Sequence, residues 1–273
     1  MTSSDISPTS VLDRFRLTDQ VAIVTGAGKG IGAAIAVAFA DAGADVALLA
    51  RTQSDLDEVA GEIRARGRRA LVLPADMNDL DALPALVDAV VAEFGGIDIV
   101  VNNAGGSPSF PFLDTRVENL EGSFHFNVSA AFELVRLTVP HLLARDGGSV
   151  INISSVAGKK STRGGLVHGT LKAAVSHMTM MMAADLAPRI RVNAILPGAI
   201  ETAALGRYLS ARDPSIRETM HSRTAMRRNG RPDDISPAAV YFASSAACWV
   251  TGKLLEVDGG ASDDLIPKTI PDL

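Results

Sequence analysis

The sequence predicts an α/β fold, a doubly wound seven-stranded parallel sheet of the Rossmann-like kind in a single domain. Two observations lead to this prediction. Short β-branched runs alternate with longer Ala- and Leu-rich segments of helical period, and the strand-like runs are apolar throughout. Strands that are apolar on both faces need helices on both sides, which favours parallel strands joined by right-handed crossovers.

The expected elements follow one another from residue 21. Strands at 21–25, 45–50, 70–75 and 97–102 alternate with helices at 31–43, 54–67 and 79–95. The second half has a helical stretch at 120–144, a strand at 149–154, a helix at 166–186, a strand at 191–196 and a closing run at 254–260. Ligands of such a fold bind at the carboxyl ends of the strands.

We expect three regions along the chain. Residues 1–16 form a mobile N-terminal arm, because the start of the chain is rich in Ser, Thr and Asp and poor in large apolar groups. Residues 17–273 form the single domain. Within it, 201–230 is a candidate substrate lid, because polar and basic residues there interrupt the alternation of strands and helices.

Composition and charge argue against several classes of binding partner and against a place in the membrane. The formal net charge of -5 argues against nucleic acid or an anionic membrane as partner. The apolar runs are far shorter than the roughly 20 residues of a membrane-spanning helix. The single cysteine, Cys248, cannot form an intramolecular disulfide, and the first residues do not read as a secretion signal. A cytoplasmic protein is expected.

The first strand leads into a glycine-rich turn, Thr25-Gly26-Ala27-Gly28-Lys29-Gly30-Ile31-Gly32. Glycines let the backbone approach a diphosphate at the start of a helix, where free amides and the helix dipole favour an anion. The spacing differs from G-x-G-x-x-G, because Ile31 occupies the third glycine's place. The turn alone is therefore weak evidence for a dinucleotide.

Further motifs follow in order along the chain. They are Asp76 after the third strand, Asn102-Asn103-Ala104-Gly105 after the fourth, Asn127, Ile153-Ser154-Ser155, Lys172, Pro197-Gly198 with Thr202, and Val257-Asp258-Gly259-Gly260. With the glycine-rich turn, this pattern resembles the short-chain dehydrogenase/reductase family from about residue 21 to 260. The resemblance is greatest to hydroxysteroid dehydrogenase-like and 3-oxoacyl reductase-like members.

The resemblance implies a nicotinamide dinucleotide site. Its candidate residues are Gly26, Gly28, Lys29, Gly30, Ile31, Gly32, Arg51, Asp76, Met77, Asn103, Ala104, Gly105, Lys172, Pro197, Gly198, Ile200 and Thr202. By resemblance, Asp76 contacts the adenine and Thr202 the carboxamide. Other interpretations stay open: Asp76 caps the next helix, Asn103 fixes a turn, and Thr202 is an ordinary loop residue.

Two basic residues favour NADP(H) over NAD(H). NAD-preferring members carry an acidic residue at the end of the second strand, where this chain has Ala50 followed by Arg51. Lys29 and Arg51 can converge on a 2′-phosphate through charge-assisted hydrogen bonds. The alternative is that both are ordinary solvated charges.

The catalytic pattern departs from the family at one position. The resemblance assigns Asn127, Ser155 and Lys172 to catalysis, and it requires a tyrosine four residues before the lysine. Position 168 is histidine, and the chain's two tyrosines, Tyr208 and Tyr241, lie elsewhere. In the family the tyrosine protonates the carbonyl oxygen, the serine hydrogen-bonds that oxygen, and the asparagine supports a water leading to the lysine.

His168 leaves two readings open. Imidazole exchanges protons, so an NADP(H)-dependent oxidation or reduction of a secondary alcohol or ketone remains possible through a Ser-His-Lys site. The positive charge of Lys172 should keep His168 neutral, which favours alcohol oxidation over carbonyl reduction. Alternatively the imidazole is a lost catalytic group, its ring being shorter than a phenol, in an NADPH-binding protein with a regulatory or partner role.

The remaining expectations concern substrate, metal and assembly. Phe110 to Leu113, with Leu205, Tyr208 and Leu209 of the lid, could wall an apolar pocket for a small alcohol or ketone. The histidines show no metal-ligand spacing, so no metal is expected. The family resemblance and the run of methionines at 178–182 favour a homodimer or homotetramer, although core packing would also explain the methionines.

Overall fold

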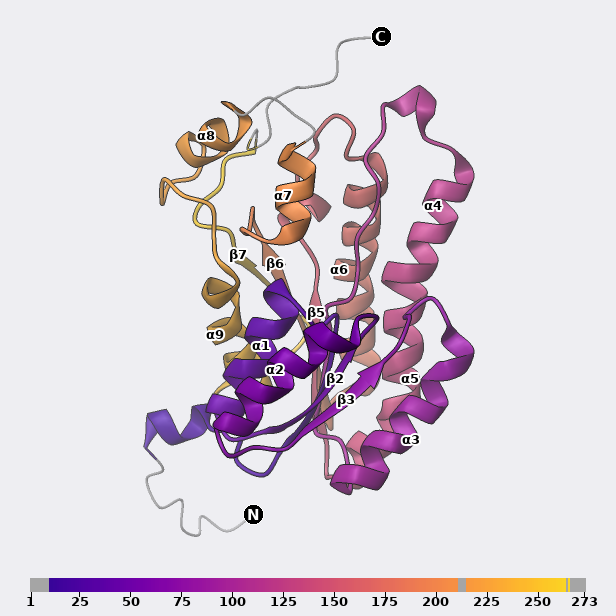
Figure 1. The fold of residues 1–273 in the computed structure, drawn as a ribbon, viewed down its shortest axis with the longest axis vertical. Helices are drawn as coiled ribbons and strands as arrows, with labels where there is room; N and C mark the ends of the chain where they lie inside the picture. The colour runs from indigo at the N-terminus through magenta and orange to yellow at the C-terminus, as the bar shows by residue number, and fades with distance from the viewer. Residues whose placement is uncertain (1–9, 211–214, 264, 266–273) are drawn as a thin grey trace.

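The fold is a single seven-stranded parallel sheet with helices on both faces, as the sequence predicts. The computed structural model describes residues 10–210, 215–263 and 265. The strand order is β3-β2-β1-β4-β5-β6-β7, and neighbouring strands in this order pair in parallel. The order reverses between β1 and β4, so a crevice opens at the carboxyl ends of these two strands. Figure 1 shows the sheet edge-on between its helices.

The strands agree with the expected runs within one to three residues. They are β1 Val21–Thr25, β2 Asp45–Ala50, β3 Ala70–Pro74, β4 Ile99–Asn102, β5 Gly148–Ile153, β6 Ile190–Pro197 and β7 Leu254–Val257. The α-helices are α1 Gly30–Asp41, α2 Gln53–Ala65, α3 Leu83–Phe94, α4 Val117–Phe124, α5 Ala130–Ala144, α6 Leu166–Leu186, α7 Ala203–Ser210, α8 Ser215–Ser222 and α9 Pro232–Ala243.

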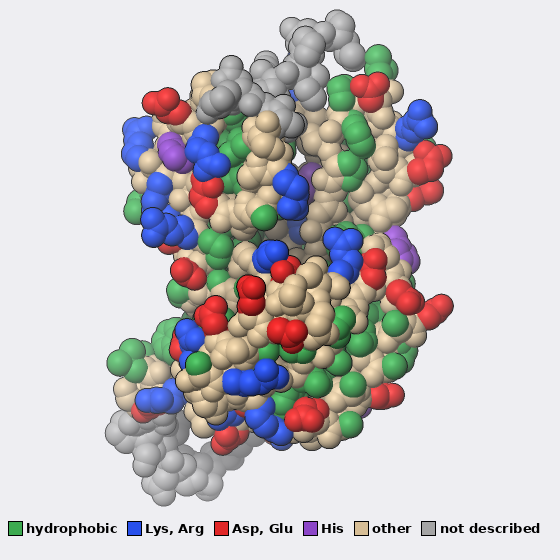
Figure 2. Space-filling model, in the orientation of Figure 1, with side chains coloured by type: hydrophobic (Ala, Val, Ile, Leu, Met, Phe, Trp, Pro, Cys, Tyr) green, Lys and Arg blue, Asp and Glu red, His purple; other side chains and the backbone are tan. Residues whose placement is uncertain are grey.

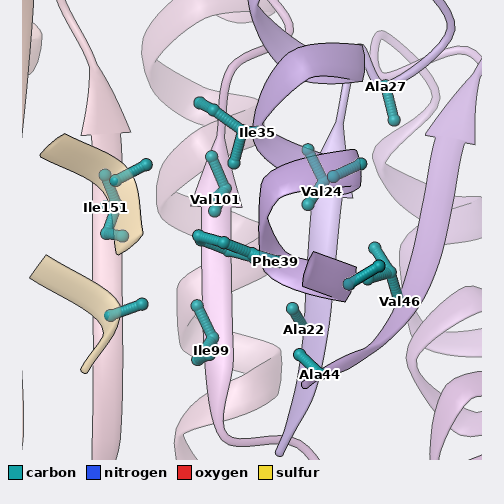
Figure 3. Packing of buried hydrophobic residues seen from close by; sticks show 14 of the residues in the cluster. Ala22, Val24, Ala27, Ile35, Phe39, Ala44, Val46, Ile99, Val101 and Ile151 are labelled. Atoms are coloured by element: carbon teal, nitrogen blue, oxygen red, sulfur yellow. The ribbon is translucent and has the colours of Figure 1, made fainter. Parts of the chain in front are cut away.

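Two buried clusters cover the two faces of the sheet. On one face α1, α2 and α9 pack against the central strands, and Phe39 of α1 is fully buried over them. Figure 3 shows Phe39 and Ile35 pointing at side chains of β1 and β4. On the other face α3, α5 and α6 contribute Leu83, Leu134 and Met182. Both faces of the strands are therefore apolar, which explains the continuous apolar runs of the sequence.

The expected helix at 120–144 contains a local irregularity. Its chain is helical from α4 through α5, but His125–Ser129 forms a π-helical turn between them. Such turns are rare and widen the helix by one residue. The turn carries Asn127, which is buried.

The N-terminal arm and the candidate lid both contain helical turns in the structure. Val11–Phe15 forms a 3-10 turn, and the Phe15 ring lies 6.1 Å from that of Tyr241 in α9. The last part of the expected arm is thus placed against the domain, while residues 1–9 lie outside the described residues. The candidate lid carries α7 and α8, which lie together above the sheet in Figure 1. No helix in the described ranges is long and apolar enough to cross a membrane.

Candidate functional site

The glycine-rich turn between β1 and α1 is closely packed by its own backbone. A Cβ on Gly32 would lie 2.3 Å from the Gly26 carbonyl oxygen and 2.5 Å from Nδ2 of Asn103. The first turn of α1 therefore rests directly on the loop that precedes it. With no side chain there, the free amides at the start of α1 remain accessible to an anion.

Asn103 ties this turn to the neighbouring strand. Its Nδ2 donates to the carbonyl oxygens of Thr25 and Gly26, at 2.9 and 3.2 Å. The Thr25 hydroxyl accepts from the backbone amides of Asn103 and Ala104 and donates to the Val101 carbonyl. Asn103 thus does fix a turn, and in doing so it joins the carboxyl ends of β1 and β4 at the crevice.

Lys29, in the glycine-rich turn, forms an ion pair. Its Nζ lies 2.9 Å from an oxygen of Asp55, in the first turn of α2. Asp55 also packs close to Gly28, because a Cβ added to Gly28 would lie 3.0 Å from the Cβ of Asp55. Arg51, by contrast, is exposed and has no ion pair among the residues described. The two basic residues therefore differ in how readily they can bind a phosphate.

Asp76 lies at the end of β3, near Arg51. It accepts hydrogen bonds from the backbone amide and side chain of Asn78, at 3.0 and 2.9 Å. The bond from the Asn78 backbone, then the bond from its side chain, and last the positive charge of Arg51 hold the pKa of this carboxyl below its ordinary value. The next helical turn is capped by Asp79, which accepts from the Ala82 amide. Met77 is buried beside β3 and α3.

The end of β6 approaches the glycine-rich turn. A Cβ on Gly30 would lie 3.1 Å from the methyl group of Thr202, so these two segments are in contact. The hydroxyl of Thr202 accepts from the Leu205 amide at the start of α7. Pro197 and Ile200 are buried, and the Gly198 amide donates to the Val257 carbonyl. The structure thus brings the candidate cofactor residues to one edge of the sheet.

Lys172 is buried in the middle of this edge. Its Nζ donates to the Ile153 carbonyl at the end of β5, at 2.9 Å. Burial lowers the pKa of the ammonium group to about 8. The group is thus still mostly protonated at pH 7.

His168 lies one helical turn before Lys172 and therefore on the same face of α6. Burial and then the positive charge of Lys172 lower the pKa of its imidazole to about 4. The ring is neutral at pH 7, as the sequence led us to expect. Its Nδ1 lies 3.2 Å from the hydroxyl oxygen of Ser107. Figure 2 shows a hollow beneath α7, in which histidine and basic side chains are visible.

Asn127 contacts the loop after β4 rather than Lys172 directly. Its Nδ2 donates to the carbonyl oxygens of Gly106 and Ser123, both at 2.8 Å, and its Oδ1 accepts from the Gly106 amide. Gly105 lies between the two candidates, since a Cβ there would be 2.7 Å from Oδ1 of Asn127 and 3.4 Å from Nζ of Lys172. Only glycine fits at this position.

Ser155 follows the end of β5, two residues after the carbonyl that holds Lys172. Its hydroxyl accepts from the Ala157 amide at 3.1 Å, so its oxygen is oriented by the backbone. Ser154, which the sequence matched only as part of a motif, donates to the Lys172 carbonyl and accepts from the Ser176 hydroxyl. It fixes β5 against α6.

The expected apolar pocket is only partly formed as predicted. Phe110, Pro111 and Phe112 line a cavity of about 810 Å³ with residues 157–166 and the adjoining face of α6. Ser155, His168 and Lys172 are not among its lining residues. Leu205, Tyr208 and Leu209 pack instead with α8 in a separate cluster. The loop after β4 and the lid therefore do not share one apolar wall.

Two contacts of this site were missed by sequence reasoning. They are Ser107 beside His168 and Asp55 beside Lys29. Neither residue belongs to a motif, so only the folded chain identifies their partners. Within the described ranges, no group of three or more His, Cys, Asp or Glu could hold a metal ion.

Comparison with known proteins gives consistent matches over almost the whole chain. The family described as enoyl-(acyl carrier protein) reductase matches residues 26–262. An uncharacterized oxidoreductase of Mycobacterium tuberculosis is 50% identical over 96% of this chain and 100% of its own length. The 7α-hydroxysteroid dehydrogenase of Escherichia coli K12 is 38% identical over 93% of this chain and 98% of its own.

Solved structures show the same likeness in three dimensions. A 7α-hydroxysteroid dehydrogenase complexed with NADH and 7-oxo glycochenodeoxycholic acid superimposes with a TM-score of 0.88 at 38% identity. The match covers 93% of this chain and 98% of that one. The sheet order and the helical layers described above are therefore those of this group of enzymes.

Proposed function

Because the chain belongs to the short-chain dehydrogenase/reductase family of oxidoreductases, we propose that it transfers a hydride between NADP(H) and a secondary alcohol or ketone. One observation carries the proposal: His168 and the buried Lys172 share one face of α6 at the carboxyl edge of the sheet. The neutral imidazole favours alcohol oxidation over carbonyl reduction, so the chain would act as an alcohol dehydrogenase with the coenzyme as hydride acceptor.

The glycine-rich turn fits the coenzyme that this family uses. A Cβ at Gly32 would meet the Gly26 carbonyl oxygen, so the start of α1 lies against its own loop without a side chain between them. A Cβ at Gly26 would meet the Asn103 side chain, and one at Gly30 would meet the Thr202 methyl group. The backbone amides there would hold the diphosphate, with Gly28 and Ile31 in the same turn. Asp76 and Met77 would border the adenine, and Thr202 with Pro197, Gly198 and Ile200 the carboxamide. When bound, the nicotinamide would accept or supply the hydride.

The chain's own side chains would manage the proton. Ser155 would hydrogen-bond the substrate oxygen, since its hydroxyl hydrogen is available while its oxygen accepts from a backbone amide. His168 would take the hydroxyl proton of an alcohol, because its imidazole is neutral above a pKa of about 4. Lys172 would hold positive charge beside them, and Asn127 would fix the loop that borders both.

The preference for NADP(H) rests mainly on Arg51. It is exposed, has no ion pair among the described residues, and follows Ala50 where NAD-preferring members carry an acid. Lys29 would have to leave Asp55 to join it on a 2′-phosphate. Tighter binding of NADPH than NADH supports this part of the proposal, and tighter binding of NADH contradicts it.

We also propose a cytoplasmic homodimer or homotetramer. Apolar side chains are exposed on the layer formed by α4, α5 and α6, among them Phe124, Phe132 and Met181. A second copy would cover them. Sedimentation analysis tests this arrangement, and a purely monomeric protein would contradict it.

The central experiment compares wild type with His168→Ala and His168→Tyr. Oxidation of a panel of secondary alcohols, hydroxysteroids included, is measured with NADP+ by absorbance. We expect His168→Ala to lose roughly hundredfold in kcat/KM, because general-base catalysis contributes on that scale. Binding of NADPH should be unchanged in both variants.

The opposite result is equally clear. If wild type turns over no faster than His168→Ala while His168→Tyr gains activity, the imidazole is not catalytic. The chain is then an NADPH-binding protein with a regulatory or partner role. If neither dinucleotide binds, the function itself is wrong.

A further inference from the structure

The hydrogen bond between Ser107 and His168 has no counterpart among the motifs of the sequence. Ser107 lies in the loop after β4, two residues beyond the Gly105 that separates Asn127 from Lys172. Its hydroxyl oxygen is 3.2 Å from Nδ1 of His168. Nε2, at the far side of the ring, makes no hydrogen bond within the described part of the chain. Nε2 is thus the nitrogen left for a reacting oxygen.

The loop that carries Ser107 is fixed on both sides of it. Gly106, the preceding residue, is held by Asn127 through both its amide and its carbonyl. Ser109 donates from its hydroxyl to the Gly164 carbonyl, at 2.8 Å, just before α6 begins. Ser107 is therefore presented to His168 by two independent tethers rather than by chance contact on a free loop.

The chemistry of alcohol oxidation selects one tautomer of His168. A neutral imidazole carries its proton on one nitrogen and keeps a lone pair on the other. An alcohol can pass its proton only to a nitrogen with a free lone pair. If that nitrogen is Nε2, Nδ1 must carry the ring proton and needs an acceptor. The Ser107 oxygen occupies that place.

We infer that Ser107 is a positioning residue, which accepts a hydrogen bond from Nδ1 of His168 and so keeps Nε2 bare as the base. This inference rests on the proposed oxidation of an alcohol. Once Nε2 has taken the proton, the same contact stabilises the imidazolium, because both ring nitrogens are then donors. Asn127 contributes indirectly by holding Gly106, and it needs no contact with the ring.

The pH behaviour of the pair follows from the charges around the ring. The loop after β4 places Ser107 beside the ring, and its hydroxyl is not ionised near neutral pH. Lys172, on α6 itself, is the charged group that lowers the imidazole pKa. A hydroxyl acceptor opposes that effect by favouring the protonated ring. Removing it should therefore lower the pKa further.

The first test reads the tautomer directly and needs no turnover. Protein labelled with 15N-histidine is examined by NMR at pH 7, and the His168 signals are identified by their loss in His168→Ala. We expect the proton on Nδ1 in wild type and a changed tautomer balance in Ser107→Ala. A proton on Nε2 in wild type, or identical ring signals in the two proteins, would overturn the inference.

The second test measures kcat/KM for alcohol oxidation in three variants. Ser107→Ala should lose about tenfold through kcat, since a misplaced base no longer meets its proton. Ser107→Thr, which keeps the hydroxyl, should restore most of the rate. Ser109→Ala is the matched control, because it removes a tether of the same loop without touching the ring. Equal losses in Ser107→Ala and Ser109→Ala would mean that Ser107 acts only through loop structure.

The two tests separate the inference from the proposed function. If NMR finds Nδ1 protonated toward Ser107 but no alcohol is oxidised, the positioning contact stands and the activity does not. If alcohols are oxidised but the tautomer is independent of Ser107, the activity stands and the positioning role fails.

Discussion

The glycine-rich turn after β1 and the His168 face of α6 lie at the same edge of the sheet, but different interactions hold them in place. The turn consists of backbone held by backbone and by one amide, that of Asn103. The His168 face consists of side chains held by two other segments, the loop after β4 through Ser107 and the end of β5 through Ile153. Motif residues supply most of the first kind of site, although Asp55 beside Lys29 lies outside them. The second kind depends on neighbours that no motif includes.

The largest expected effect breaks the backbone site. Gly32→Ala places a Cβ 2.3 Å from the Gly26 carbonyl, so the loop and α1 must separate. We expect at least a hundredfold loss of affinity for either dinucleotide, about 2.8 kcal/mol. Fluorescence titration with NADPH measures it. Gly61→Ala in α2 is the matched control, because nothing lies within 4 Å of its Cβ and alanine favours the helix. A normal affinity in Gly32→Ala would show that the turn does not bind the dinucleotide.

The second prediction concerns the side-chain site and the pH dependence of kcat/KM that His168 should cause. With the imidazole pKa at about 4, about one His168 ring in a thousand is protonated at pH 7. Protonation rises as pH falls, so kcat/KM for ketone reduction should rise about tenfold per unit from pH 7 to 5. Alcohol oxidation needs the neutral ring and should stay level over the same range.

His168→Tyr is the control for this pH profile. A phenol keeps its proton throughout the range, since its ordinary pKa is about 10. Reduction by the variant should therefore lack the steep rise toward acid. Wild-type reduction that is independent of pH, or faster in alkali, would contradict the role of His168 as proton donor.

The third prediction concerns the basic residues beside the turn. Asp55→Asn removes the ion pair that holds Lys29 and also a negative charge near the place proposed for the 2′-phosphate. Because an ion pair whose lysine is exposed is worth about 1 kcal/mol, NADPH affinity should rise up to about fivefold while NADH affinity stays the same. Calorimetric titration with both dinucleotides measures the difference.

Asp57→Asn provides the matched control for that change. Asp57 lies on the same helix and accepts from Gln53, which is a solvent-exposed contact. The Asp57→Asn substitution removes one negative charge, as Asp55→Asn does, but it leaves the ion pair between Lys29 and Asp55 in place. If both substitutions raise NADPH affinity equally, the effect is one of overall charge and not of the Lys29 pair.

The comparison also explains how far sequence reasoning reached. Seven strands, both helical layers and the crevice follow from periodicity, because burial on both faces leaves a continuous apolar signature. The neutrality of His168 was predicted, since Lys172 follows it by one helical turn wherever the helix lies in the fold. The partners Ser107 and Asp55 could not be predicted, because Ser107 lies in a loop of unknown path and Asp55 in α2, a helix whose placement beside Lys29 no motif specifies. The same limit applies to the apolar pocket, whose expected lid residues pack with α8 instead.

The smallest expected effects distinguish the roles of two aspartates after β3, Asp76 and Asp79. Asp79 accepts from the Ala82 amide, so Asp79→Ala should cost about 1 kcal/mol of folding free energy and leave dinucleotide affinity unchanged. Asp76 holds only a local turn at Asn78 and faces the end of the sheet where the adenine is proposed. Asp76→Asn should therefore weaken NADPH and NADH alike, by about threefold, since one hydrogen bond is exchanged. Urea unfolding and dinucleotide titration on both variants give the result. Should Asp76→Asn change stability alone, Asp76 is a turn residue, and the adenine lies against backbone rather than a carboxylate.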